Sequence, residues 1–355
     1  MTSHRKPLPK VEMARGFAAF YVLTYDIFES VSGKLGLAGV ALRFGPEAVM
    51  LFFVISGFVI AYSVAQKEMK FREYFVRRFR RIYPLFLVAL LLGAADYLFF
   101  RKQPVPVREL FGNLFMLQDL GYLKPGTWFA PFAGIAPLWS LAYEWWFYML
   151  FFPVWTLVPK TFQLPVVTAI STVALIAYVH LPNQICAFLM YFILWWTGVE
   201  LAREFTTTGK VTFAGQRNTI LSLGSFAVVS VFFLMRAPVY GAPRWGGFPT
   251  LQIRQIVSAF VVLIGALAWN RAKWIGFAQI FRPFLWVAPI SYAIYLFHVP
   301  LLVNTDTYLG LFESRAVQLF VGFTVLLVFS IGGELYLQPW INRFLTVSPV
   351  RKAHQ

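Results

Sequence analysis

About ten hydrophobic runs, separated by short polar segments, constrain this chain more than any other feature of its sequence. Each run is roughly 17–25 residues long, the length that a helix needs to cross the apolar core of a bilayer. Of the 355 residues, 59% are hydrophobic and 13% are charged, whereas about a quarter of a soluble domain is charged. The sequence therefore predicts an all-α, polytopic membrane helix bundle that forms a single domain over residues 1–355. The predicted spans are residues 13–31, 47–65, 84–100, 137–158, 165–180, 184–201, 219–236, 252–269, 284–303 and 316–337.

Positive charges between the spans predict how the bundle is oriented. Residues 66–83 carry seven Lys and Arg side chains between two apolar runs, and the positive-inside rule places such a segment in the cytoplasm. Both termini are then cytoplasmic, and the first run is expected to be an uncleaved span because no small-residue cleavage pattern follows it. The outer segment, residues 101–136, is rich in proline and aromatic residues. We expect it to cap the outer face or to dip partly back into the bilayer.

Net charge and cysteine content exclude several other classes of function. The formal charge of +16 would suit a nucleic acid only if the basic residues formed one solvated patch. They lie between apolar runs instead, so loop topology and anionic lipid headgroups explain most of them, and membrane lipids rather than nucleic acid are the expected partners. The single cysteine, Cys186, excludes an internal disulfide. No paired His or Cys at ligand spacing supports a metal site.

Charged residues within the first span predict a polar stripe. Arg15 and Asp26 are eleven residues apart, which is about three helical turns or roughly 16 Å. They share a face with Ala19, Val22 and Glu29, and a charged face in lipid is costly, so we expect this face to look into the bundle. The structural alternative is that Arg15 snorkels to the inner headgroups while Asp26 pairs with a neighbour.

A carboxylate also interrupts the fourth span. Glu144 lies in its middle third, with Ser140 one turn before it and Tyr148 one turn after it. Such a group either forms a structural ion pair or works as a base or a substrate anchor. The hydroxyl and aromatic neighbours on the same face favour the functional interpretation.

The ninth span carries a similar polar face. Ser291, Tyr295 and His298 stand at positions i, i+4 and i+7, which lie on one side of a helix. A single histidine in a span is as compatible with a hydrogen-bonded core residue as with a catalytic base, and both interpretations stay open.

Arginines dominate the second half of the basic segment. Arg77 and Arg81 are one helical turn apart, with Arg78 and Arg80 alongside and Tyr83 following. A topology anchor requires positive charge but not arginine in particular, whereas planar guanidinium groups donate paired hydrogen bonds to phosphate. The composition of this segment therefore favours phosphate recognition.

Five motifs in order over residues 14–298 resemble successive signatures of the acyltransferase-3 family of integral membrane acyltransferases. The motifs are RGFAAFYVLTYD, GPEAVMLFFVISGF, RRFRRIYP, WSLAYEWWFY and SYAIYLFH. The resemblance implies a bundle of about ten helices in the bacterial inner membrane that moves an acyl group to a hydroxyl of an extracytoplasmic glycan or lipid-linked sugar. It also implies a cytoplasmic acyl-CoA donor, usually acetyl-CoA, associated with an Arg-x3-Arg element that matches Arg77 and Arg81.

One position departs from the family pattern. The family's first-helix signature is an Arg, ten residues and then a His held to be catalytic, but Asp26 occupies that place here. In the second motif, Pro46 precedes Glu47 where a His is frequent. A histidine is suited to remove a hydroxyl proton near neutral pH. Three hypotheses remain, in order of preference: an engineered inactive variant, a natural pseudoenzyme, or Asp26 working as the base.

The mechanism expected from these observations places the acyl-CoA phosphates at the basic segment and the proton acceptor at position 26. Glu144 would orient the base or the sugar, and Arg15 would hold the donor or adjust the electrostatics of the stripe. The candidate catalytic residues are Asp26, Glu144, Arg15 and His298. The candidate donor-binding residues are Arg77, Arg78, Arg81 and Tyr83, and the candidate substrate-binding residues are Glu47, Ser140, Tyr148, Ser291 and Tyr295.

Two further classes of function compete with acyl transfer. A transporter or flippase of a lipid-linked sugar could use the buried charges as a gated path, but such proteins are typically built from paired repeats, and the sequence has no visible repeat. A membrane scaffold without chemistry would leave the charges inside the spans without a purpose.

Overall fold

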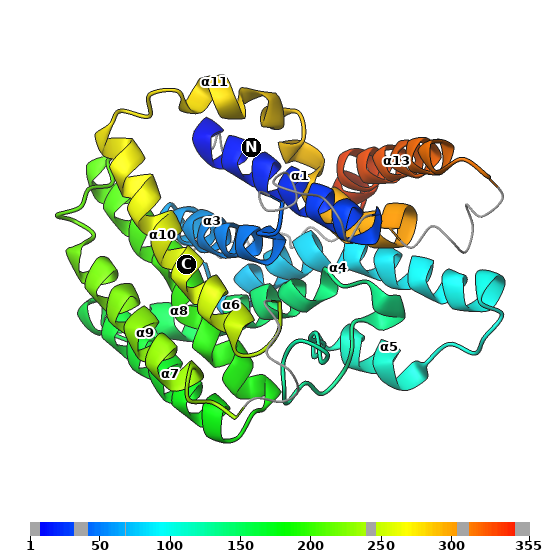
Figure 1. The fold of residues 1–355 in the computed structure, drawn as a ribbon. Helices are drawn as coiled ribbons and strands as arrows, with labels where there is room; N and C mark the ends of the chain where they lie inside the picture. Colours follow the sequence, from blue (N-terminus) through cyan, green and yellow to red (C-terminus); the bar gives the residue numbers. More distant parts are fainter. Residues whose placement is uncertain (1–7, 32–41, 68, 239–245, 304–311, 345–355) are drawn as a thin grey trace, which may run out of the picture.

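The computed structural model describes residues 8–31, 42–67, 69–238, 246–303 and 312–344, and these ranges form a bundle of helices without a β-strand (Figure 1). The longer helices are α1 (Pro9–Val31), α3 (Gly45–Ala65), α4 (Phe71–Ala95), α6 (Leu138–Leu157), α7 (Lys160–His180), α8 (Gln184–Thr208), α9 (Arg217–Leu234), α10 (Thr250–Arg271) and α13 (Arg315–Ile331). The shorter ones are α5 (Val107–Leu114), α11 (Phe277–Phe281), α12 (Ser291–His298) and α14 (Gln338–Phe344). Tighter 3-10 turns are η2 (Phe132–Gly134), η3 (Arg282–Leu285) and η4 (Ala288–Ile290), and wider π turns are η1 (Asp96–Phe100), η5 (Val299–Val303) and η7 (Gly332–Leu337).

The predicted fold class, an all-α polytopic membrane bundle, is confirmed, whereas the count of ten spans is not. Within the described residues, seven helices are long and apolar enough to cross a bilayer. The number rises to eight if the bent pair Phe277–Leu285 and Ala288–Val303 forms one span. The two other predicted spans, 13–31 and 137–158, coincide with α1 and α6, the helices that carry the predicted catalytic charges.

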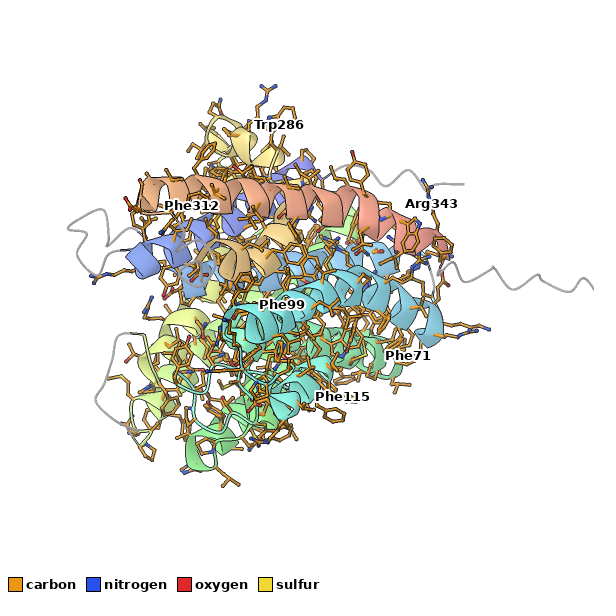
Figure 2. The ribbon with its side chains drawn as sticks, turned by 90° about the vertical axis from the view of Figure 1, so that its right-hand side faces the viewer. Phe71, Phe99, Phe115, Trp286, Phe312 and Arg343 are labelled. Carbon is orange, nitrogen blue, oxygen red and sulfur yellow. The ribbon has the colours of Figure 1, made fainter. Side chains whose placement is uncertain are left out.

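Large apolar side chains cover the outside of the bundle, as a bilayer requires. Figure 2 shows Phe71 on α4, Phe99 on η1 and Trp286 after η3 projecting from the ribbon. Phe99 is 72% exposed and Trp286 is 87% exposed. Exposed aromatic residues on this scale would promote aggregation in water, but they are favourable against lipid.

The centre of the bundle is the contact between α3 and α8, where two glycines bring the helix backbones together. A Cβ atom on Gly57 would lie 2.1 Å from the carbonyl oxygen of Trp195, and one on Gly198 would lie 2.0 Å from that of Val54. Helices in lipid associate through such small residues because close backbone approach gains van der Waals contact. The contact also fixes the position of Ser56, which directly precedes Gly57 in α3.

The basic segment is mostly helical. α4 begins at Phe71 and continues without interruption through Pro84, so the arginines at positions 77–81 project from the first turns of a helix. Glu73 accepts hydrogen bonds from Arg77, at 2.6 Å, and from Lys67, at 3.0 Å, and an ion pair at i and i+4 supports the start of a helix. The helix therefore holds its guanidinium groups in a fixed register.

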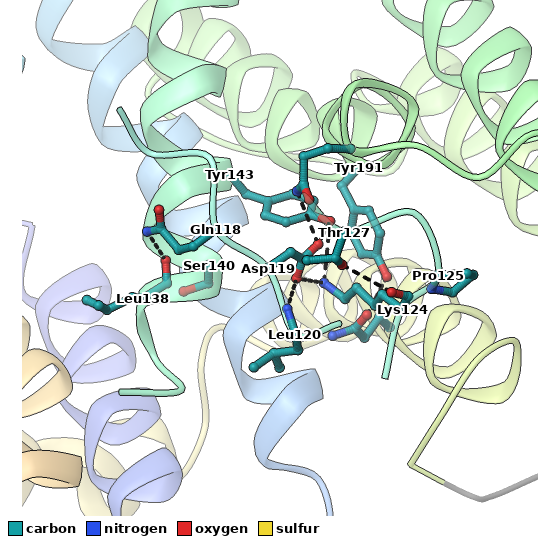
Figure 3. A network of polar contacts seen from close by, with 12 residues as sticks. Gln118, Asp119, Leu120, Lys124, Pro125, Thr127, Leu138, Ser140, Tyr143 and Tyr191 are labelled. Atoms are coloured by element: carbon teal, nitrogen blue, oxygen red, sulfur yellow. Dashed lines mark hydrogen bonds and ion pairs between the residues drawn. The ribbon is translucent and has the colours of Figure 1, made fainter. Parts of the chain in front are cut away.

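Residues 101–136, the predicted outer segment, are anchored in the bundle by a buried ion pair (Figure 3). Lys124 donates to Asp119 at 2.9 Å, and both side chains are 1% exposed. The hydroxyl of Tyr143 on α6 donates to Asp119 at 2.6 Å, and the Lys124 ammonium lies 3.7 Å from the centre of the Trp139 ring. Burial lowers the pKa of Lys124, and the adjacent carboxylate opposes that shift. Part of this segment thus packs into the bundle.

Candidate active site

A cavity of about 830 Å³ lies between α3, α4, α6 and α12, and residues of α1, η7 and α14 and four arginines of α4 also contribute to its lining. This volume is within the range of small-molecule sites. Nine of the thirteen predicted site residues line it, namely Arg15, Arg77, Arg78, Arg81, Ser140, Glu144, Tyr148, Ser291 and Tyr295. The other four, Asp26, Glu47, Tyr83 and His298, lie outside its lining.

The charged part of the lining is predominantly basic. Five arginines and three glutamates contribute to it, so it keeps a formal excess of positive charge. Arg81 donates to both oxygens of Glu334, at 2.6 and 3.1 Å, and Arg77 is held by Glu73. Glu334 lies in the π turn η7 that follows α13, and π turns occur frequently at functional sites.

Arg78 differs from its neighbours, because no carboxylate among the described residues pairs with it. Its Nε is buried and has no hydrogen-bond acceptor. The guanidinium carbon lies 5.6 Å from the centre of the Tyr74 ring and 5.8 Å from that of Tyr148. A buried donor without an acceptor is rare, and an anion in the cavity would satisfy it with a charge-assisted hydrogen bond.

The predicted polar stripe of α1 faces the bundle from Arg15 to Asp26, whereas the side chain of Glu29 lies outside the described residues. Arg15 donates to the carbonyl of Ala288 at 2.9 Å and to Glu12 at 2.5 Å, and Ala19 and Val22 are buried. The stripe thus packs against the segment that leads into α12, while Arg15 also reaches the cavity.

Glu144 is the centre of a cluster of hydroxyl groups inside the cavity. Ser56 Oγ donates to Glu144 Oε1 at 2.5 Å, and the hydroxyl of Tyr148 donates to the same oxygen. The two hydroxyl oxygens are 3.1 Å apart. This arrangement brings a carboxylate from α6 against a serine from α3, within hydrogen-bond reach of each other, which is the geometry of a base and a nucleophile.

Tyr295 connects the cavity with the residues behind it. Its hydroxyl lies 2.6 Å from Ser140 Oγ in the cavity wall, and its ring centre lies 6.1 Å from that of His298. The nearby Ser291 donates its hydroxyl to the carbonyl of Ala288 at 2.8 Å. Ser291 therefore uses its proton within its own turn, whereas Ser140 and Tyr295 bridge α6 and α12.

Asp26 and His298 contact each other directly beyond this wall. His298 Nε2 lies 2.7 Å from Asp26 Oδ2, and Nδ1 lies 3.0 Å from the carbonyl oxygen of Ile294. A neutral imidazole carries one N–H, yet both partners are acceptors, so a second proton on the pair completes both contacts. His298 is fully buried, while the Asp26 side chain is 21% exposed. The carboxylate is thus the accessible member of the pair.

Two predicted residues serve contacts elsewhere. Glu47 forms an ion pair with Arg254 at 2.5 Å, which joins α3 to α10. The Tyr83 hydroxyl donates to the carbonyl of Leu114 at 3.2 Å, at the end of α5. Neither side chain lines the cavity, so neither is placed to contact a ligand bound there.

Sequence reasoning missed Ser56 and Glu334. Both interrupt apolar runs, Ser56 within the second span and Glu334 within the tenth. The same rule that singled out Asp26, a polar group where lipid would penalise it, could have identified Glu334. Nothing local distinguishes Ser56 from a serine that bonds to its own helix.

Within the described ranges, acidic, histidine and cysteine side chains do not gather into a metal site. Among the residues that the structure describes, no group of three or more such side chains could hold an ion.

Comparison with known proteins gives a consistent set of relatives. The acyltransferase MdmB of Streptomyces mycarofaciens is 33% identical over 154 residues, which are 42% of this chain and 39% of MdmB. The O-acetyltransferase OatA of Staphylococcus aureus is 25% identical over 338 residues, 85% of this chain and 51% of OatA. The putative peptidoglycan O-acetyltransferase YrhL of Bacillus subtilis is 24% identical over 333 residues, 85% of this chain and 50% of YrhL. The chain spans about half the length of these curated relatives or less. No solved structure matches it.

A family model described as an acyltransferase domain matches residues 8–337. The match covers nearly the whole chain and includes all five motifs on which the resemblance depends. Apart from Gln338 and Asn342, the residues that line the cavity lie within it, as do the buried polar contacts described above. The chain belongs to the acyltransferase-3 family.

Proposed function

We propose that this protein is a membrane O-acyltransferase that moves an acyl group, most simply acetyl, from acyl-CoA to a hydroxyl of a glycan. Acyl transfer breaks the thioester C–S bond, forms an ester C–O bond and moves the hydroxyl proton to the departing thiol. The names of OatA and YrhL support O-acetylation, and that of YrhL supports peptidoglycan as the first acceptor to test. A lipid-linked sugar is the alternative acceptor.

The unpartnered guanidinium of Arg78 is the observation that carries this proposal. A cavity lined by five arginines, two of which, Arg15 and Arg78, have a buried Nε without an acceptor, suits a ligand with phosphate groups at one end. Acyl-CoA has this form. Its phosphates would lie at the mouth of the cavity, near Arg77, Arg78 and Arg81, with the basic end of the bundle in the cytoplasm. Its thioester would reach inward to Glu144.

The acceptor would meet the acyl group from the opposite side, and Asp26 would remove its proton. Asp26 is the exposed member of the pair with His298. A proton taken up by the pair is shared between Oδ2 and Nε2 and satisfies both ring nitrogens at once. General base catalysis by a positioned side chain is typical of such transfers.

The contact with His298 favours one of the three hypotheses for position 26. An isolated aspartate in place of a histidine would support an inactive protein. Here the carboxylate stands against an imidazole from another helix, 2.7 Å away, so carboxylate and imidazole act as one proton-accepting unit. We therefore propose that Asp26 works as the base with His298 behind it.

Purified full-length protein in lipid nanodiscs tests the donor assignment. Acetyl-CoA is supplied with peptidoglycan strands, free thiol release is followed with a thiol-reactive dye, and acetyl esters are identified by mass spectrometry. We expect thiol release that depends on the acceptor. Arg78→Ala should raise KM for acetyl-CoA by roughly 10–100-fold, because a hydrogen bond to a charged group contributes about 1.5–3 kcal/mol.

Arg72→Ala is the matched control. Arg72 lies on the same helix but is exposed and outside the cavity lining, so its removal should leave KM unchanged. If the native protein releases no thiol with any glycan or lipid-linked sugar and does not bind acetyl-CoA, the proposed function is wrong. An unchanged KM in Arg78→Ala would refute the assignment of the phosphate site alone.

A further inference from the structure

The hydroxyl of Ser56 is used differently from most helical hydroxyl groups in this protein. Thr168, Thr197 and Ser230 each donate to the carbonyl four residues earlier, at 2.8, 3.0 and 2.7 Å, as serine and threonine in helices typically do. Ser56 instead directs its hydroxyl away from its own helix, to Glu144 Oε1 at 2.5 Å. Its proton is therefore held by a carboxylate inside the cavity.

We propose that Ser56 is the nucleophile that carries the acyl group between donor and acceptor, as an acyl ester. This inference rests on the proposed function, since it concerns the path that the acyl group takes. A hydroxyl becomes a competent nucleophile when an adjacent base accepts its proton and a third group orients the base. Glu144 is the base, and Tyr148, which donates to the same carboxylate oxygen, orients it.

The position of Ser56 and Glu144 in the cavity fits this role. Ser56, Glu144 and Tyr148 line the same cavity as the arginines, so a thioester anchored by its phosphates can reach Ser56. Asp26 and His298 lie outside that lining, behind Tyr295 and its contact with Ser140. A donor and an acceptor that enter from opposite sides need not be bound at the same time if the acyl group is held covalently on Ser56 between the two half-reactions.

In the first half-reaction, Ser56 Oγ attacks the thioester carbonyl and its proton passes to Glu144. The C–O bond forms, the C–S bond breaks, and the departing thiolate takes the proton from Glu144 to leave as CoA thiol. The Tyr148 hydroxyl lies 3.1 Å from Ser56 Oγ. It can turn toward the site of attack as negative charge develops on the thioester carbonyl group. The positive charge of Arg78, whose guanidinium carbon is 5.8 Å from the centre of the Tyr148 ring, lies nearby.

In the second half-reaction, the acceptor hydroxyl attacks the acyl-Ser56 carbonyl. Asp26 accepts the hydroxyl proton, the new ester C–O bond forms, and the bond to Ser56 Oγ breaks. Ser56 Oγ takes a proton from water in the cavity through Glu144, and Asp26 releases the acceptor's proton to water on the acceptor side, so one proton is taken up for each one released. The sum of the two halves is one thioester consumed and one ester formed, and no oxidant or metal is required.

Isotope exchange and covalent labelling test the proposal in the purified full-length protein. Without acceptor, the native protein should exchange radiolabelled CoA into acetyl-CoA, because the first half-reaction is reversible and independent of the second. After incubation with radiolabelled acetyl-CoA and an acid quench, the label should map to the peptide that contains Ser56. Ser56→Ala should lose exchange and label, and its kcat should fall by at least roughly 10³-fold.

Two variants separate chemistry from folding. Ser56→Cys keeps the size of the side chain and should be labelled as a thioester that hydroxylamine removes. Ser63→Ala removes a serine two turns further along α3 that is outside the cavity lining, and it should retain both exchange and label.

Three results would overturn the inference while leaving the proposed function intact: acceptor-dependent transfer by the native protein with no exchange, a label on Tyr148, or full transfer activity in Ser56→Ala. If Ser56→Ala were active without any label, Ser56 would be a positioning residue for Glu144. Failure of the native protein to use acetyl-CoA at all would refute the proposed function instead, so the two failures can be distinguished.

Discussion

Asp26 and His298 are separated by 272 positions in the chain, yet Oδ2 of one lies 2.7 Å from Nε2 of the other. α1 supplies the carboxylate and α12 supplies the imidazole. The ring also contacts the carbonyl of Ile294, which fixes its orientation. The two side chains therefore form one unit in which the buried imidazole supports the more exposed carboxylate.

We predict that Asp26→Asn still binds acetyl-CoA but loses most of its transfer activity. The amide cannot accept the acceptor's proton, so kcat should fall by about 10²–10⁴-fold. KM for acetyl-CoA should not change, since Asp26 is not part of the cavity lining. Steady-state kinetics with acetyl-CoA and glycan measure both values. Asp26→His should be more active than Asp26→Ala, because it restores a base at this position; equal rates in the two variants would show that position 26 is not the base.

We predict that Arg81 and Glu334 are coupled in donor binding. Arg81→Ala leaves the buried Glu334 carboxylate, which is 4% exposed, without its cation beside the phosphate site. The double variant Arg81→Ala/Glu334→Gln should therefore bind acetyl-CoA more tightly than Arg81→Ala alone, with a coupling of roughly 0.5–3 kcal/mol. Calorimetric titration of the four proteins measures this cycle. Additive effects of the two substitutions would show that the ion pair does not influence donor binding.

We predict that Lys124→Met destabilises the outer segment. The substitution leaves Asp119 as a buried charge without its cation, which typically costs about 3–5 kcal/mol. Thermal unfolding in detergent should show a lowered midpoint, and Lys124→Met/Asp119→Asn should recover part of the loss because the uncompensated charge is gone. A midpoint that is unchanged in Lys124→Met would mean that the ion pair seen in Figure 3 contributes nothing to stability.

We predict that Gly57→Ala is disruptive, although alanine is the better helix former. Its Cβ would lie 2.1 Å from the Trp195 carbonyl oxygen, so α3 and α8 must separate, at a cost of about 1–3 kcal/mol or more. Gly265→Ala in α10 is the control, because a Cβ there meets no atom within 4 Å. It should be neutral or stabilising by up to about 1 kcal/mol. Equal unfolding midpoints for the two variants would argue against the close approach of the helices.

Much of the fold could be predicted because its determinants are local. The cost of placing polar groups in lipid acts on each span separately, so runs of apolar residues indicate helices without knowledge of their neighbours. The two predicted spans beyond the eight that length and hydropathy support, on α1 and α6, show the limit of this rule. Arg15, Asp26 and Glu144 make these helices less apolar, and the same residues identify them as parts of a site.

The candidate site could be predicted only in part. Glu144 and the arginines of α4 stood out because each is a charge in or beside an apolar run, and most of them do line one cavity. Glu47 satisfied the same criterion, but its carboxylate pairs with Arg254 outside the cavity lining. A charge within a span indicates that a partner must exist, and it does not indicate whether that partner is a ligand or another helix.

The sequence by itself determined that this chain is a helical membrane protein of the acyltransferase-3 family with an arginine-rich segment and charges inside its spans. Only the tertiary structure decided that Asp26 faces His298, that Ser56 donates to Glu144 and that Arg78 has no carboxylate partner within the described residues. The physical reason is that burial penalties depend on each residue and its immediate neighbours, whereas these contacts depend on how helices far apart in the chain pack against each other, through features such as the glycines that bring α3 and α8 together.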